Sequence, residues 1–157
     1  MDFMLTEQQQ MMKKLFAEFA EKEVKPLAAE VDEEERFPRE TVEKMKACKM
    51  MGIPYSREYG GAGADYLCYI LAVEELSKKC GTTGVVLSAH TSLGTWPIAQ
   101  FGTPEQKERY LPDLCTGKKL AAFGLTEPNA GTDAAGQQTT AVKDGEDYIL
   151  NGTKIFI

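Results

Sequence analysis

The sequence lacks the features that would place the chain in a membrane or on nucleic acid. None of its apolar runs approaches the roughly 18 residues needed to cross a bilayer. Its first ten residues, MDFMLTEQQQ, have neither the basic start nor the apolar stretch of a secretory signal. Lysine and arginine number 18 against 24 aspartate and glutamate residues, which gives a formal charge of −6. Because binding to phosphates needs clustered cations, a nucleic-acid partner is disfavoured.

Histidine and cysteine are too few and too scattered for most metal or nucleophile chemistry. His90 is the only histidine in 157 residues, so a two-histidine metal site is excluded within the chain. A serine–histidine triad would lack a G-x-S-x-G turn, and we expect His90 to be a polar residue on a helix face. The four cysteines, Cys48, Cys68, Cys80 and Cys115, form no C-x-x-C pair. We therefore predict no metal site and four buried, reduced thiols, as in a cytoplasmic protein.

What the sequence does contain is a run of helical patterns over its first two thirds. Thr6 and Gln9 have the spacing of a capping box, and apolar residues then recur every three or four positions. Pro26 has no backbone N–H and should kink or break this helix. Further helices are predicted over residues 37–52, 65–79, 85–93 and 103–117, with a short segment at 96–102. The helix at 65–79 is too apolar for a surface helix and should be central.

Near residue 120 the patterns become those of strands. Strands are predicted over residues 120–125, 138–143, 148–151 and 153–157, and the second and third are joined through Asp144-Gly145. Helices followed by strands without alternation indicate an α+β protein. We expect an all-helical domain over residues 1–119 and the opening strands of an incomplete β domain over 120–157. Because the last strand would lack neighbours, we also expect the sequence to be part of a longer protein.

The segment at 123–133 carries residues suited to a ligand. It reads FGLTEPNAGTD and combines two hydroxyls, two carboxylates, a proline and an inner glycine. Backbone N–H groups and threonine hydroxyls in such a loop can bind a flat, polar-edged group or a phosphate. The segment is neither a P-loop, since no G-K-S/T follows, nor a dinucleotide fingerprint, since no helical pattern follows. On the residues alone, a ligand loop and an ordinary connecting turn both stay open.

This segment, together with NGTKIFI at 151–157, resembles the flavin-binding signature of the acyl-CoA dehydrogenases. The resemblance covers the whole chain: it includes the LTEQQ opening, EYGGAG at 58–63, AVEEL at 72–76 and FGTPEQK at 101–107. It is most similar to the short-chain, butyryl-CoA dehydrogenases of anaerobic bacteria. The family has an N-terminal helical domain, a middle β domain and a C-terminal helical bundle. Its reaction is the α,β-dehydrogenation of an acyl-CoA thioester.

The resemblance implies FAD as the cofactor, with the segment at 123–132 along its isoalloxazine ring and pyrophosphate. The N–H of Leu125 and the N–H and hydroxyl of Thr126 would bind the polar edge of the ring. Thr132, often serine in the family, would lie beside the pyrophosphate and the thioester arm of the substrate. Phe156 and Ile157 match a pair that packs on the flavin. The implied cofactor residues are Phe123, Gly124, Leu125, Thr126, Gly131, Thr132, Phe156 and Ile157.

The resemblance implies no catalytic residue within the chain, because the family's base lies in the C-terminal bundle. Glu127 is assigned a structural role in its loop, and this chain alone should show little or no turnover. Leu93 and Trp96 either fill a shallow acyl pocket or are plain core residues. The implied partners are an acyl-CoA substrate, an electron-transferring flavoprotein and, at full length, the other copies of a cytoplasmic homotetramer.

Two other functions stay open on the sequence. The first is a non-catalytic helical module that binds a partner through its acidic faces. The second keeps the fold and changes the chemistry, as in an acyl-CoA oxidase or an enoyl-CoA reductase.

Overall fold

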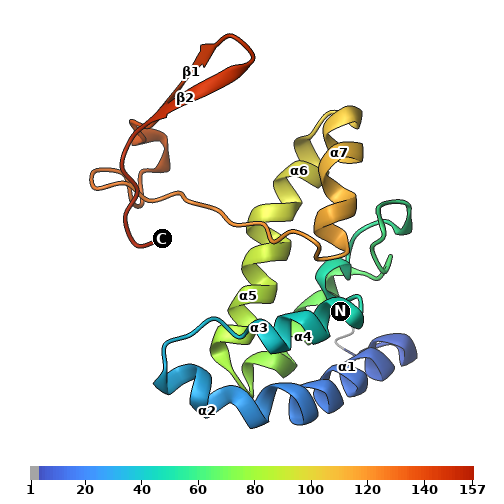
Figure 1. The fold of residues 1–157 in the computed structure, drawn as a ribbon. Helices are drawn as coiled ribbons and strands as arrows, with labels where there is room; N and C mark the ends of the chain where they lie inside the picture. The colour runs from blue at the N-terminus through green and yellow to red at the C-terminus, as the bar shows by residue number, and fades with distance from the viewer. Residues whose placement is uncertain (1–3) are drawn as a thin grey trace. The chain divides into compact units, whose positions relative to one another are not determined.

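The computed structural model describes residues 4–157, which fall into two compact units. The first unit ends at Ala122 and is helical, whereas the second, from Phe123 to Ile157, contains a two-stranded antiparallel sheet (Figure 1). This order of helices followed by strands confirms the predicted α+β class.

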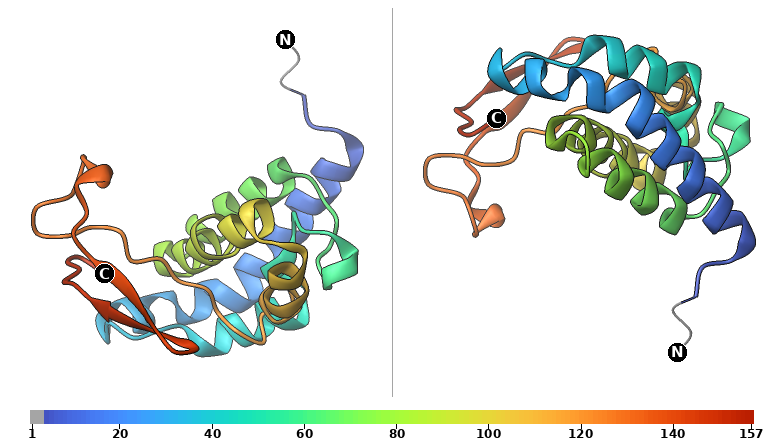
Figure 2. Two further views of the ribbon diagram at one scale, coloured as in Figure 1. Left: turned by 90° about the horizontal axis from the view of Figure 1, so that it is seen from above. Right: turned by 90° about the horizontal axis from the view of Figure 1, so that it is seen from below.

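The first helical stretch continues through a proline. Its parts are α1 (Glu7–Phe19), the π-helical segment η1 (Ala20–Val24) and α2 (Lys25–Glu33). The predicted capping box is present, with the Thr6 hydroxyl accepting from the Gln9 N–H at 3.2 Å. Of the kink or break predicted at Pro26, the break is absent, because the helix runs on to Glu33 (Figure 2). Proline offers no N–H to the carbonyl four residues earlier, and the wider π turn before it accommodates the missing bond.

The second helix, α3 (Arg39–Ala47), is shorter than predicted. Its Val42 and Met45 are buried, but Cys48 is exposed, so the prediction of four buried thiols is wrong at this position. The reason is that α3 ends at Ala47, so Cys48 no longer follows the helical periodicity that places Val42 and Met45 on the buried face. Two short 3₁₀ segments, η2 (Met50–Gly52) and η3 (Arg57–Tyr59), lead on to the next helix.

The helix α4 (Tyr66–Ser77) packs against both α1 and α5 (Gly81–Ser88), as predicted for a central helix. Asp65 caps it by accepting a hydrogen bond from the Cys68 N–H at 2.7 Å. Leu71, Ala72 and Leu76 lie on its buried face, whereas Leu67 and Ile70 are 43% and 52% exposed. The helix is therefore central, but one of its faces, which carries Leu67 and Ile70, is exposed.

Residues 81–101 form one continuous helical stretch rather than the two predicted pieces. After α5 come the π-helical segment η4 (Ala89–Thr95) and α6 (Trp96–Phe101). Pro97 follows η4 as Pro26 follows η1, so the same π-before-proline arrangement occurs twice. The next helix, α7 (Pro104–Cys115), has the predicted capping box at Thr103.

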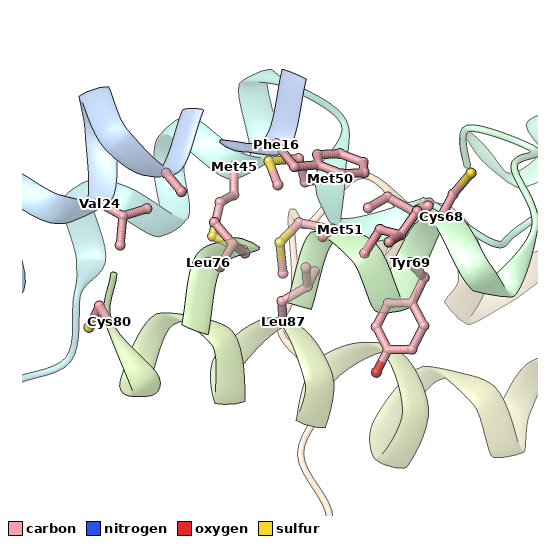
Figure 3. Packing of buried hydrophobic residues seen from close by; sticks show 14 of the residues in the cluster. Phe16, Val24, Met45, Met50, Met51, Cys68, Tyr69, Leu76, Cys80 and Leu87 are labelled. Atoms are coloured by element: carbon pink, nitrogen blue, oxygen red, sulfur yellow. The ribbon is translucent and has the colours of Figure 1, made fainter. Parts of the chain in front are cut away.

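The core of the helical unit is formed by side chains from α1, η1, α2, α3, η2, α4 and α5. Figure 3 shows Met45, Met51, Leu76 and Leu87 gathered there beneath Phe16 of α1. Each of these side chains is at most 6% exposed. A second, smaller cluster joins Tyr55, Leu111 and Cys115.

The second unit is built around a hairpin. Its elements are the 3₁₀ segment η5 (Ala134–Gly136) and the strands β1 (Thr140–Asp144) and β2 (Asp147–Asn151), which pair in antiparallel register. Gly145 has φ of 61° in the connecting turn, as the Asp-Gly signal predicts. The strands predicted at 120–125 and 153–157 are absent. In the described chain, residues 120–125 make no backbone–backbone hydrogen bond and residues 153–157 make one. Because a strand needs a ladder of such bonds with a neighbouring strand, neither segment forms one.

Candidate functional site

Glu127 organises the second unit. Its side chain is nearly buried, and its carboxylate accepts hydrogen bonds from the Gln138 N–H at 2.6 Å, the Thr139 N–H at 3.1 Å and Lys154 Nζ at 2.9 Å. The bond from Gln138, followed by those from Thr139 and Lys154, lowers the pKa of Glu127 from its ordinary 4.5 to about 2. The Glu127 and Ala130 backbones also bond to each other across the turn. Glu127 therefore has the structural role expected of it.

Leu125 and Thr126 use their carbonyl groups within the unit and leave their donors free. The Leu125 carbonyl accepts from Gln137 Nε2 at 2.6 Å and from Lys154 Nζ at 2.9 Å, and the Thr126 carbonyl accepts from the Ile155 N–H at 3.0 Å. Within residues 4–157, neither backbone N–H donates a hydrogen bond, and the Thr126 hydroxyl has no partner. Free donors on a frame held in this way can bind an electron-rich ring edge.

The other sequence-predicted residues do not all lie together. A Cβ built on Gly124 would lie 3.9 Å from the Ile157 side chain, so these two residues lie next to each other. The rings of Phe123 and Phe156 are exposed. Gly131 and Thr132 lie in an exposed bend, and in the described chain they make no hydrogen bond to Gly124 or Ile157. The structure thus brings together Gly124, Leu125, Thr126 and Ile157.

Sequence reasoning missed Lys154, which ties the two segments of this site together. Its Nζ lies 2.9 Å from both the Leu125 carbonyl oxygen and Glu127 Oε1. A signal was available, because Lys154 is a lone cation directly before the apolar residues 155–157. A charge in such a stretch is usually paired with an opposite charge.

The residues expected around an acyl pocket lie in the first unit. Leu93 is 49% exposed, and Trp96 is half-buried with its ring edge-to-face against Phe101, 5.4 Å between centroids. The alternative that both are plain core residues is therefore wrong for Leu93. Neither Leu93 nor Trp96 lines the cavity of about 350 Å³ between α6 and α7. That cavity is lined by Pro97, Ile98, Phe101, Gly102, Gln106 and Tyr110.

His90 lies on the helical segment η4, as expected for a polar residue on a helix face. Its side chain is only 1% exposed, and both ring nitrogens bond to backbone groups, those of Leu114 and Ala121. Across residues 4–157, no three His, Cys, Asp or Glu side chains gather where they could hold a metal ion. No helix in the same range is long and apolar enough to span a membrane.

Known proteins resemble this chain over its whole length. The family model for the acyl-CoA dehydrogenase N-terminal domain matches residues 6–118, and that for the middle domain matches residues 122–157. The chain is 62% identical over 157 residues to a short-chain specific acyl-CoA dehydrogenase of Clostridium acetobutylicum, covering 100% of this chain and 41% of that protein. It is 48% identical over 159 residues to an acryloyl-CoA reductase (NADH) of Anaerotignum propionicum, covering 100% and 40%. The chain thus spans about two fifths of these relatives.

Solved structures give the same result. A chain in a structure of the electron transferring flavoprotein of Acidaminococcus fermentans matches with a TM-score of 0.94 at 55% identity, covering 99% of this chain and 41% of that one. Butyryl-CoA dehydrogenase from Megasphaera elsdenii matches at 0.91 and 48%, covering 99% and 42%. An acyl-CoA dehydrogenase complexed with FAD from Bacillus anthracis matches at 0.87 and 37%, covering 96% and 26%.

Proposed function

Because this chain belongs to the acyl-CoA dehydrogenase family, we propose that it supplies the helical domain and the first part of the β domain of an FAD-dependent enzyme. The reaction is the α,β-dehydrogenation of a short-chain acyl-CoA thioester. The likeness to a short-chain specific relative and to a butyryl-CoA dehydrogenase supports this substrate class. We propose the domains as residues 1–119, helical, and residues 120–157, the start of the β domain.

The observation that carries the proposal is the set of free donors at Leu125 and Thr126, on a frame held by Glu127 and Lys154. FAD supplies the hydride acceptor when it is bound. Donors at the pyrimidine edge of its ring would stabilise the negative charge that develops on reduction. The proposed FAD contacts are Phe123, Gly124, Leu125, Thr126, Gly131, Thr132, Phe156 and Ile157. Thr132 is also the proposed contact to the substrate's thioester arm.

We assign no catalytic residue to this chain. The buried carboxylate at the site, Glu127, accepts three hydrogen bonds and stays ionised to low pH. A base that removes an α proton needs a free lone pair within reach of the substrate. Three of the roughly four lone-pair sites of Glu127 are engaged. We therefore expect this chain alone to show little or no turnover.

The remaining proposals concern partners and location. The likeness to a chain in a structure of an electron transferring flavoprotein supports such a protein as the electron acceptor. A homotetramer stays a prediction, which mass photometry of the full-length gene product would test. We also propose a cytoplasmic location, supported by the four cysteines, which remain free thiols.

The test is FAD binding by the full-length gene product that contains this sequence. Thr126→Val removes the hydroxyl and keeps the side-chain shape, and Thr140→Val on β1 is the matched control. Loss of one hydrogen bond to the ring corresponds to roughly a tenfold weaker Kd, or about 1.4 kcal/mol. We expect that loss in Thr126→Val only. A folded, colourless protein that never takes up FAD would contradict the proposal and favour the partner-binding module.

A reductase is the second candidate, because the chain is 48% identical to an acryloyl-CoA reductase (NADH). The two functions are separated by assaying the full-length gene product in both directions. Dehydrogenation predicts turnover of butyryl-CoA with an artificial electron acceptor. Reduction predicts NADH-dependent consumption of acryloyl-CoA without turnover in the first assay.

A further inference from the structure

His90 joins α7 to the segment that leads out of the helical unit. Its Nε2 lies 3.1 Å from the Leu114 carbonyl oxygen, and its Nδ1 accepts a hydrogen bond from the Ala121 N–H at 3.0 Å. A ring that donates at one nitrogen and accepts at the other is neutral, with its proton on Nε2. The two backbone partners therefore select one protonation state and one tautomer.

Gly94, four residues further along η4, contacts the same residue. A Cβ built on Gly94 would lie 2.2 Å from Ala121 Cβ and 2.8 Å from the Ala121 carbonyl carbon. Only a glycine permits this approach. His90 and Gly94 thus form two neighbouring contact points on one segment, and we refer to this pair as the Ala121 dock.

The dock lies just before the candidate flavin segment. Ala121 is two residues ahead of Phe123, where that segment begins. Of the described residues, 120–124 make no hydrogen bond other than the one from Ala121 to His90. Within the helical unit, the placement of residues 120–122 therefore depends on the dock more than on any ladder or cap.

We propose that His90 is a positioning residue: its neutral ring holds Ala121, two residues before the 123–132 segment, and a second proton on the ring releases it. Protonation places an N–H on Nδ1, where it faces the Ala121 N–H. Two donors then oppose each other, and the hydrogen bond is lost. The link to flavin rests on the proposed function, whereas the dock itself does not.

The surroundings of His90 keep its ring neutral near pH 7. Burial lowers the pKa of His90 below its ordinary 6.5, and the Lys46 ammonium of α3 acts in the same direction. The carbonyls of Leu114 and Met51 act in the opposite direction. Release is therefore expected at a pH below 6.5.

The other elements packed around η4 add little charge. The segments α5, η2 and α6 carry no ionisable side chain within their bounds. On α7, burial raises the pKa of the Cys115 thiol to about 11, so it is neutral, and Asp113 is paired with Lys118 and Lys119. Burial also raises the pKa of Tyr55, whose hydroxyl donates to the Thr91 carbonyl at 2.6 Å.

The test exploits the single histidine, whose ring gives one unambiguous NMR titration. His90→Asn places a carbonyl oxygen near the position of Nδ1 and keeps an acceptor for Ala121, whereas His90→Gln keeps a donor near Nε2 and loses that acceptor. Exchange of the Ala121 amide, normalised to its intrinsic rate, is measured in the flavin-free chain. We expect at least tenfold faster exchange in His90→Gln and in Gly94→Ala, and near wild-type exchange in His90→Asn.

The pH dependence distinguishes a positioning role from a merely structural one. In the wild-type chain, Ala121 protection should be lost at the pH where the ring titrates, and His90→Asn should show no such step. Equal protection in His90→Gln and wild type, or a ring titration that leaves Ala121 unchanged, would overturn the proposal. If the variants do not fold, the wild-type titration decides alone.

The link to flavin is tested separately, in the full-length gene product. FAD affinity should weaken as pH falls through the His90 titration in the wild type, but not in His90→Asn. Identical pH profiles would refute the positioning role while leaving FAD binding intact. Failure to bind FAD at any pH would refute the proposed function, and amide exchange would still decide the dock.

Discussion

Gly61 lies directly against the carbonyl group of Tyr55: a methyl group at position 61 would come within 2.2 Å of that oxygen. The same loop returns hydrogen bonds from Gly61 to Ser56 and from Gly63 to Tyr55. Because the obstacle is backbone, no rotamer change relieves it. The EYGGAG sequence therefore forms a closely folded loop.

Gly61→Ala should destabilise the chain by about 1–3 kcal/mol, the usual cost of overpacking. Gly81→Ala is the matched control, because a Cβ there meets nothing within 4 Å. It should change stability by less than about 0.5 kcal/mol. Urea unfolding followed by circular dichroism gives both values. Equal stabilities for the two variants would contradict the prediction, because they would show that the loop shifts to accommodate the methyl group at no cost.

Replacing Thr91 or Thr95 by valine should stabilise the folded chain. Both hydroxyls are buried in η4 and have no hydrogen-bond partner in the described chain. Replacing each by a methyl group removes an unsatisfied polar group, for an expected gain of about 1 kcal/mol per site.

Ser92→Ala is the control for this pair, because its hydroxyl donates to the Ser88 carbonyl at 2.7 Å in the same segment. It should not stabilise the chain. A loss of stability in both valine variants would mean that the two hydroxyls are satisfied by solvent in solution.

Glu127→Gln should loosen the second unit. The amide would present N–H groups where the Gln138 and Thr139 N–H groups now donate, and it would lose the charge that Lys154 contacts. We expect large shifts of the 138 and 139 amide signals and faster proteolysis after residue 122. Glu146→Gln, in the exposed hairpin turn, should leave both measurements unchanged.

The same carboxylate makes the second unit sensitive to acid. The pKa of Glu127 is about 2 when folded and 4.5 ordinarily, so the unfolded chain binds its proton first as pH falls. The stabilisation is complete above pH 4.5 and is lost progressively as pH falls to about 2. Amide signals of β1 and β2 followed over this range should report the loss. The Glu127→Gln variant should show a shallower dependence.

Local chemistry in the sequence predicted the helix starts and the hairpin. The caps at Thr6, Asp65 and Thr103 and the turn at Gly145 depend on residues no more than three positions apart, so the pattern suffices. The passage through Pro26 was missed, because a helix carried by its packing tolerates a lost hydrogen bond that would end an isolated one.

The candidate site was only half predictable for the same reason. The segment at 123–132 could be identified from its residue types, but the bonds that orient it come from Lys154 and Ile155, nearly thirty positions away. The prediction of strands at 120–125 and 153–157 was wrong because a β-prone sequence needs a partner strand to form a ladder. Burial of His90 was likewise set by α7 and Ala121, neither of which is close in sequence.

The π-helical segment η1 also determines where the chain can change length. A π turn holds one residue more than an α turn, so deleting one residue from Ala20–Val24 would leave a regular turn with Val31 still on its buried side. The same deletion inside α1 would rotate everything after it by about 100° around the helix axis. Because η4 carries His90 and Gly94, it lacks that freedom, and single-residue deletions should be tolerated at η1 rather than at η4.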